Sequence, residues 1–186
     1  TGFPARREEA RRRGKLRGIG VANYVDTASG VARERAEITV HPEGRVSVVV
    51  GTVSNGQGHE TSFAQLVTEW LGVPIGQVDI IAGDTDIVKV GGGTHSGRGM
   101  RLISIVTFNA TRQIVDKGKR IAARLLESDP SQVAFEAGRF IVAESGRAVG
   151  LFDVAAAAER LDDLPHDLCG PLAAFSDETV KEASFP

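Results

Sequence analysis

The residues best suited to chemistry lie in a short glycine-rich segment, residues 55–61, which reads Asn-Gly-Gln-Gly-His-Glu-Thr. It separates a strand-like run at 46–53 from an apolar pattern with helical spacing at 63–71. The first N–H groups of a helix lack intrahelical partners and lie at the positive end of its dipole, so this junction suits an oxyanion such as phosphate. Gln57 adds an amide that both donates and accepts hydrogen bonds. Taken alone, the segment is more often a strand-to-helix turn that binds nothing.

A second glycine-rich segment follows the same order of elements. A strand-like run at 78–82 leads through Asp84-Thr85-Asp86 to residues 90–100, Val-Gly-Gly-Gly-Thr-His-Ser-Gly-Arg-Gly-Met, and then to a long helical pattern. Thr94, His95, Ser96 and Arg98 are donors that hydrogen-bond phosphate and polar heterocycles, and arginine can do so bidentately. The alternative is a mobile glycine loop with an exposed arginine, which leaves the clustering of donors unexplained.

The two segments are expected to meet in space. If the two preceding strands share one sheet and run in the same direction, both segments emerge at the same edge of that sheet. The two following helices would then direct their positive ends into one cleft, to which Arg98 would add a full charge and Thr94 a hydroxyl.

Together these motifs resemble the large subunit of the molybdenum hydroxylases, the family of xanthine dehydrogenase and aldehyde oxidase, and most closely the carbon monoxide dehydrogenase-like large subunits. The similarity includes the Gly-Gln-Gly-His-Glu-Thr run at 56–61, Gly-Asp-Thr-Asp at 83–86 and the second glycine-rich segment, and extends to residues 3–6 and 14–20. In the family the second segment more commonly ends in Gly-Ser-Arg-Ser, whereas here it reads Ser96-Gly97-Arg98-Gly99. Two of the hydroxyl groups that contact a bound dinucleotide in the family are therefore missing or displaced.

The resemblance implies that the chain binds molybdenum as molybdopterin cytosine dinucleotide. In the family the matching glutamine hydrogen-bonds an oxygen ligand of the metal, so Gln57 is expected beside the metal and is not an acid or a base. No residue is expected to bind the metal itself, because His59 and His95 have no third partner at ligand spacing. The expected cofactor contacts are Gly56, Gln57, Gly58, His59, Thr94, His95, Ser96, Gly97 and Arg98.

The same resemblance implies an oxidoreductase whose partners are the rest of the large subunit, an FAD-binding medium subunit and an iron–sulfur small subunit. The family's glutamate base, near the end of the complete subunit, has no matching motif here, so the chain is expected to be a fragment that is inactive alone. The only cysteine, Cys169, excludes an iron–sulfur cluster within the chain and is compatible with a cytoplasmic location, which is the one expected.

The composition of the chain limits the classes of partner that it can bind. A formal net charge of −2 argues against bulk binding of nucleic acid or an anionic membrane, and no apolar run is long enough for a transmembrane helix. Residues 6–17 carry seven basic and two acidic side chains. A nucleic-acid-binding arm is one interpretation, but no aromatic residue interleaves for base stacking, so a solvated helix with i,i+4 ion pairs is favoured.

Hydrophobic periodicity favours the α+β class: a mixed sheet with antiparallel hairpins and two main helices. The domain assignment is a basic helical arm at 1–15, a molybdopterin-binding domain at 16–161 and a linker at 162–186 toward a missing C-terminal domain. The predicted elements are a helix at 5–13, strands at 16–27, 35–41, 45–53 and 77–82, a helix at 60–71 ended by Gly72, a helix at 99–126 bent or weakened by Gly118, a hairpin at 133–135 and 139–143, and a helix at 151–160.

Two other functions fit the same residues. Glycine-rich loops alone do not specify their ligand, so the chain could be a nucleotide- or anion-binding module with no redox role. It could also be a structural interaction domain whose glycine-rich segments are turns.

Overall fold

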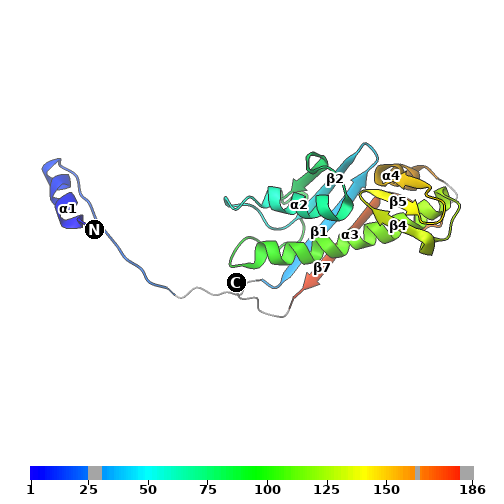
Figure 1. Ribbon diagram of the computed structural model, residues 1–186. Coiled ribbons are helices and arrows are strands. Elements are labelled where there is room, and N and C mark those ends of the chain that lie inside the picture. The colour runs from blue at the N-terminus through cyan, green and yellow to red at the C-terminus, as the bar shows by residue number, and fades with distance from the viewer. Residues whose placement is uncertain (25–30, 162–163, 181–186) are drawn as a thin grey trace.

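The computed structural model describes residues 1–24, 31–161 and 164–180. A four-stranded sheet with the order β3-β2-β1-β7 forms the centre of the α/β body, and a three-stranded sheet, β4-β5-β6, lies toward one end of it (Figure 1). The elements in chain order are α1 (Phe3–Arg12), β1 (Arg33–His41), β2 (Arg45–Val50), α2 (His59–Leu71), β3 (Val78–Ile81), α3 (Arg98–Leu125), β4 (Val133–Glu136), β5 (Arg139–Val142), β6 (Ala148–Gly150), α4 (Leu151–Arg160) and β7 (Leu172–Thr179), with short 3-10 turns at Ile75–Gln77 and Pro130–Gln132.

Strands β1 and β2 form the predicted antiparallel hairpin, from the pair Ala36–Val50 to the pair His41–Arg45. Every second residue of β1 is buried, as the two-residue period of a half-buried strand requires. Strand β3 pairs with β2 in parallel, from Val46–Val78 to Val49–Ile81. The carboxyl ends of β2 and β3 therefore lie at the same edge of the sheet.

Helices α2 and α3 cover one face of this sheet (Figure 1). Helix α2 places Phe63, Val67 and Leu71 in the core and ends at Gly72, as predicted. Gly72 adopts the left-handed conformation. Helix α3 is 28 residues long and spans the body, so that its first turn lies near the carboxyl ends of β2 and β3 and its last turns lie near the second sheet. The α+β class, the mixed sheet and the two main helices are confirmed.

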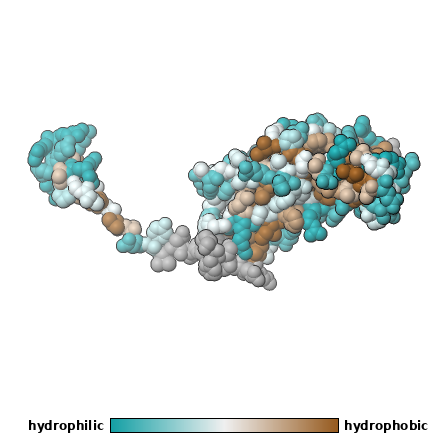
Figure 2. Space-filling view, viewed as in Figure 1, coloured by the Kyte–Doolittle hydropathy of each residue, from teal (hydrophilic) through white to brown (hydrophobic). Residues whose placement is uncertain are grey.

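Helix α1 stands apart from the α/β body in Figure 1, and its surface is mostly hydrophilic in Figure 2. None of its residues is buried. Glu8 lies 3.9 Å from Arg12 and Glu9 lies 3.5 Å from Arg13, so the expected i,i+4 ion pairs are present. The predicted solvated helix is confirmed. No helix in the described residues is long and apolar enough to cross a membrane.

The strand predicted at 16–27 is wrong for residues 16–24, which form no regular element, and residues 25–27 lie outside the described part of the chain. The side chains of Leu16 and Tyr24 are 97% and 82% exposed. A strand is stabilised by pairing with a neighbour and by burying one face. Residues 16–24 meet neither condition among the described residues, so their apolar content alone does not make them a strand.

The linker predicted at 162–186 is also wrong over Leu172–Thr179, which form β7. This strand pairs antiparallel with β1 along eight residues, from Arg33–Thr179 to Val40–Leu172. Its own sequence shows little alternation, and only Leu172 and Ser176 are buried. Pairing with β1 therefore makes this segment a strand, and residues 162–163 and 181–186 lie outside the described chain.

Gly118 was expected to bend or weaken α3, but the helix continues through it to Leu125. Its place in the packing explains the glycine. A Cβ atom added to Gly118 would lie 2.3 Å from Cζ of Phe140, a fully buried ring on β5. The missing side chain lets the second sheet pack directly on α3.

We therefore expect Gly118→Ala to destabilise the chain by about 1–3 kcal/mol, the usual cost of overpacking a core. Alanine favours helix over glycine by up to about 1 kcal/mol, so a net loss would identify the Phe140 contact as dominant. Gly76→Ala is the matched control, because nothing lies within 4 Å of its added Cβ. Urea unfolding of the purified variants measures the difference; a Gly118→Ala chain at least as stable as the parent would contradict this packing.

Candidate functional site

The two glycine-rich segments emerge at the same edge of the sheet. The first, residues 51–58, follows β2 and leads to the first residue of α2; the second, residues 82–97, follows β3 and leads to the first residue of α3. Because β2 and β3 are parallel neighbours, the expectation that the two segments share one edge is confirmed. The amino ends of both helices lie there as well, which is the usual position of ligand sites in sheets with parallel strands.

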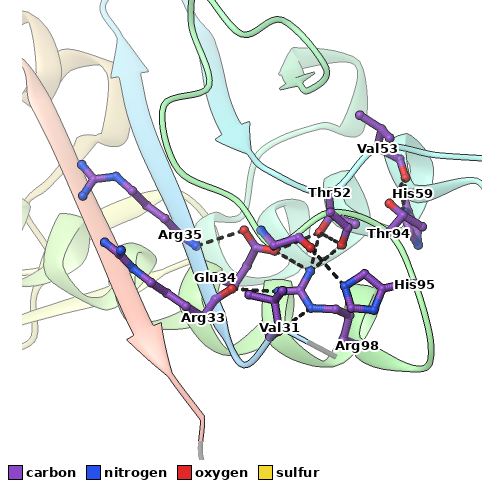
Figure 3. A network of polar contacts seen from close by, with 12 residues as sticks. Val31, Arg33, Glu34, Arg35, Thr52, Val53, His59, Thr94, His95 and Arg98 are labelled. Atoms are coloured by element: carbon purple, nitrogen blue, oxygen red, sulfur yellow. Dashed lines mark hydrogen bonds and ion pairs between the residues drawn. The ribbon is translucent and has the colours of Figure 1, made fainter. Parts of the chain in front are cut away.

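The two loops are in direct contact. Gly51 and Gly91 pack backbone against backbone: a Cβ atom added to Gly51 would lie 2.1 Å from the Cα atom of Gly91. The Thr94 hydroxyl donates a hydrogen bond to the carbonyl of Val53 on the first loop (Figure 3). The Thr52 hydroxyl lies 3.3 Å from the carbonyl oxygen of Gly93. The expected meeting of the loops is therefore confirmed, and only glycine fits at its tightest point.

The outer sides of both loops are open. A Cβ atom added to Gly56, Gly58, Gly93 or Gly97 would meet no other atom within 4 Å. The inner glycines differ, because Gly51, Gly91 and Gly92 touch neighbouring atoms closely. The backbone of both loops is thus fixed from inside and approachable from outside, a geometry that fits an anionic ligand.

Gln57 lies exposed in the first loop, where its side-chain oxygen accepts a hydrogen bond from the N–H of Asn55. The oxygen of the Gln57 amide therefore faces Asn55, and its NH2 group faces away from Asn55. Ser54 supports the same turn, since its hydroxyl oxygen accepts the N–H of Gly58 at 3.2 Å. Gln57 is thus held at the rim of the site.

The two histidines differ in position. His59 is 8% exposed, its ring stacks on Phe63 at 4.8 Å, and its Nδ1 lies 3.2 Å from the carbonyl oxygen of Val53. That imidazole packs beneath the loops and does not face the open side. His95 is exposed, and its Nε2 lies 3.1 Å from the carbonyl oxygen of Gly92.

Ser96 and Gly97 are exposed at the start of α3. Ser96 has a φ of 50°, in the left-handed region that residues with a side chain rarely occupy. Such backbone strain concentrates at ligand-binding segments, where surrounding contacts maintain it.

Arg98 does not supply a free charge to the cleft, so this part of the sequence prediction is wrong. Its guanidinium is buried and its Nη1 lies 2.9 Å from a carboxylate oxygen of Glu34, which is 1% exposed (Figure 3). Its Nε donates to the carbonyl of Val31 at 2.8 Å and its Nη2 to the carbonyl of Arg33 at 2.9 Å. The side chain is directed inward, toward the start of β1.

Glu34 and Thr52 are the residues at this edge that the sequence reasoning missed. Glu34 lies in phase with Ala36 and Ile38, both fully buried on the same face of β1. A carboxylate on the buried face of a strand requires a partner, because an unpaired buried charge is costly. That phase was the signal in the sequence that pointed to a buried ion pair.

Other ion pairs lie on the exposed side of the sheet. Arg33 lowers the pKa of Asp177 through a hydrogen bond, and Arg45 lowers the pKa of Asp79 in the same way. These pairs connect β1 to β7 and β2 to β3. In the described chain no group of three or more His, Cys, Asp or Glu side chains is arranged to hold a metal ion.

Known proteins are similar to this chain in sequence and in structure. The family described as molybdopterin cofactor-binding domain matches residues 1–176. The carbon monoxide dehydrogenase large chain of Afipia carboxidovorans is 35% identical over 150 residues, covering 73% of this chain and 18% of its own length. Subunit gamma of the 6-hydroxypseudooxynicotine dehydrogenase complex of Paenarthrobacter nicotinovorans is 34% identical over 146 residues, covering 78% of this chain and 18% of its own length.

Solved structures show a similar fold. Quinoline 2-oxidoreductase from Pseudomonas putida 86 superposes with a TM-score of 0.71 at 30% identity, covering 97% of this chain and 25% of that one. The Cu,Mo-CO dehydrogenase superposes with a TM-score of 0.72 at 28% identity, covering 96% of this chain and 24% of that one. By their names these proteins are dehydrogenases and an oxidoreductase, and one structure is named for copper and molybdenum. This chain belongs to the molybdopterin cofactor-binding domain family of molybdenum hydroxylase large subunits, and it spans about a fifth to a quarter of these relatives.

The close approach of the two loops can be tested at Gly51. We expect Gly51→Ala to lower stability by about 1–3 kcal/mol or more, because the new methyl group meets backbone that cannot rotate away. Gly97→Ala is the control within the same site, since its added Cβ meets nothing within 4 Å and its φ of −90° suits alanine. Thermal unfolding measures both; equal melting temperatures would show that the loops are not in contact.

Proposed function

We propose that this chain holds molybdenum as molybdopterin cytosine dinucleotide, through the two glycine-rich loops. The observation that carries the proposal is the contact between the loops at the edge where β2 and β3 end and α2 and α3 begin. Two helix amino ends and open glycine backbone at one edge attract and admit an anionic ligand.

The relatives support the cofactor more strongly than any substrate. Their names refer to carbon monoxide, quinoline and a nicotine derivative, while the matched part of each is the same domain. A segment shared by enzymes that act on such different molecules fits a shared cofactor. The substrate of the protein that contains this chain would be selected by other residues.

The proposed contacts divide by exposure. Gly56, Gly58, Gly93 and Gly97 offer open backbone, and the exposed side chains of Gln57, His95 and Ser96 lie beside them. His59 and Arg98 would contribute their backbone N–H groups at the helix amino ends, because both side chains are buried. Thr94 would act chiefly by holding the second loop to Val53.

The bound cofactor would supply oxygen transfer to the substrate and accept its electrons. This chain's part is to bind and orient it, with the Gln57 amide donating a hydrogen bond beside the metal. The proposed partners are the rest of the large subunit, an FAD-binding medium subunit and an iron–sulfur small subunit in the cytoplasm. The relative that is subunit gamma of the 6-hydroxypseudooxynicotine dehydrogenase complex supports an assembly of several subunits.

Gln57→Ala in the complete enzyme should reduce turnover by an amount equivalent to about 2–4 kcal/mol, the usual effect of removing a preorganised donor. The fold should be unaffected, because Gln57 is exposed. Gln132→Ala, an exposed glutamine in the turn before β4, is the control and should behave as wild type. Steady-state kinetics at equal molybdenum content is the measurement; wild-type turnover in Gln57→Ala would remove this residue from the site.

The purified 186-residue chain should show no hydroxylase activity, because it lacks a matching glutamate base and electron-transfer centres. Assays with aldehydes, purines and carbon monoxide check this expectation, and turnover of any of them would contradict it.

Ligand selectivity separates the proposal from an anion-binding module without a redox role. The complete protein should retain molybdopterin cytosine dinucleotide through gel filtration and release simple nucleotides. Mass spectrometry of the denatured protein identifies what is retained. Retention of cytidine nucleotides without a pterin would favour the non-redox module, and retention of no ligand would favour a structural interaction domain.

A further inference from the structure

We propose that Glu34 and Arg98 form a positioning pair that fixes the second loop in its binding conformation, and that Arg98 is not itself a ligand of the anion. This inference rests on the proposed function. It concerns two residues far apart in the sequence that the structure joins through a buried ion pair of 2.9 Å, with side chains 1% and 5% exposed.

The carboxylate of Glu34 contacts polar groups from three segments of the chain. One oxygen accepts the Thr52 hydroxyl at 2.9 Å and lies 3.4 Å from the N–H of Gly92, while the other accepts the N–H of Arg35 at 3.1 Å. Thr52 follows β2, Gly92 belongs to the second loop, and Arg35 belongs to β1. Glu34 therefore ties both loops to the strand on which it lies (Figure 3).

The guanidinium of Arg98 completes the connection from the other side. Its N–H groups donate to the carbonyls of Val31, Arg33 and Gly93, so one side chain joins the start of β1 to the second loop. The loop lies directly on this group: a Cβ atom added to Gly92 would come within 2.1 Å of Nη2. The planar guanidinium thus acts as the surface on which the loop backbone rests.

The charges explain why such a pair suits an anion site. A buried arginine beside an anionic ligand would normally be that ligand's partner, but the carboxylate of Glu34 already neutralises Arg98. The attraction for the anion then comes from helix amino ends and backbone N–H groups, whose positions depend on the pair. Lysine cannot substitute, because it lacks the planar fork that serves several acceptors at once.

The test uses the complete enzyme and measures the half-life of cofactor release, followed by the absorbance of the bound cofactor, at a temperature well below the melting point of every variant. Glu34→Gln and Arg98→Lys should each shorten the half-life roughly tenfold, as loss of groups that orient ligand-binding atoms commonly does. The double variant should release the cofactor no faster than either single variant, because the two residues act as a unit.

Thr52→Val provides a milder variant that leaves both charges paired and removes one donor to Glu34. It should shorten the half-life by a smaller factor, and it keeps the test valid if a charge variant fails to fold. Arg45→Lys is the matched control, because Arg45 forms an exposed ion pair with Asp79 on the neighbouring strand and begins β2 at the end remote from the loops. It should release the cofactor within twofold of the wild-type rate.

Three results would overturn the inference. Release from Glu34→Gln that is unchanged or slower, with faster release from Arg98→Lys, would make Arg98 a direct ligand. Strictly additive effects in the double variant would separate the two residues. An equally short half-life in Gly118→Ala, which destabilises a site remote from the loops, would show that the pair acts only through the general stability of the chain. A wild-type enzyme that retains no molybdenum cofactor would instead overturn the proposed function.

Discussion

Parallel pairing of β2 with β3 is the constraint on which the rest of the site depends. It places two strand-to-loop junctions side by side, and each loop continues into a helix whose amino end returns to the same edge. The loops then approach so closely that Gly51 and Gly91 touch through their backbones. An antiparallel β3 would carry the second loop to the opposite edge and separate the two helix ends.

The contacts beneath the loops differ in kind from those above them. Below lie buried groups in contact with one another: the Glu34–Arg98 pair, the Thr52 hydroxyl and the stacked rings of His59 and Phe63. Above lie glycines with open space and exposed polar side chains. The backbone of the loops is therefore both rigid and accessible, as a preorganised binding site requires.

Local patterns in the sequence predicted the strand–loop–helix units, because glycine clusters and periodic apolar residues record backbone geometry directly. Strand β7 was missed, since its stability comes from pairing with β1 and not from its own alternation. Arg98 was placed wrongly for a similar reason: a basic residue in a glycine loop suggests a ligand, and only the three-dimensional structure shows that Glu34 lies behind it. The in-phase glutamate on β1 was the one available signal for that pair.

The pairing of β1 with β7 also orders events during synthesis of the protein. Thr179 pairs with Arg33, the neighbour of Glu34, so the strand that carries the buried carboxylate is flanked on one side by residues made almost 150 positions later. Contacts between such distant segments form late, because the intervening chain must be made first. While the chain is still emerging from the ribosome, β1 has an open edge beside Glu34. The strand that carries Glu34 therefore gains its second neighbour only after this whole segment has been translated.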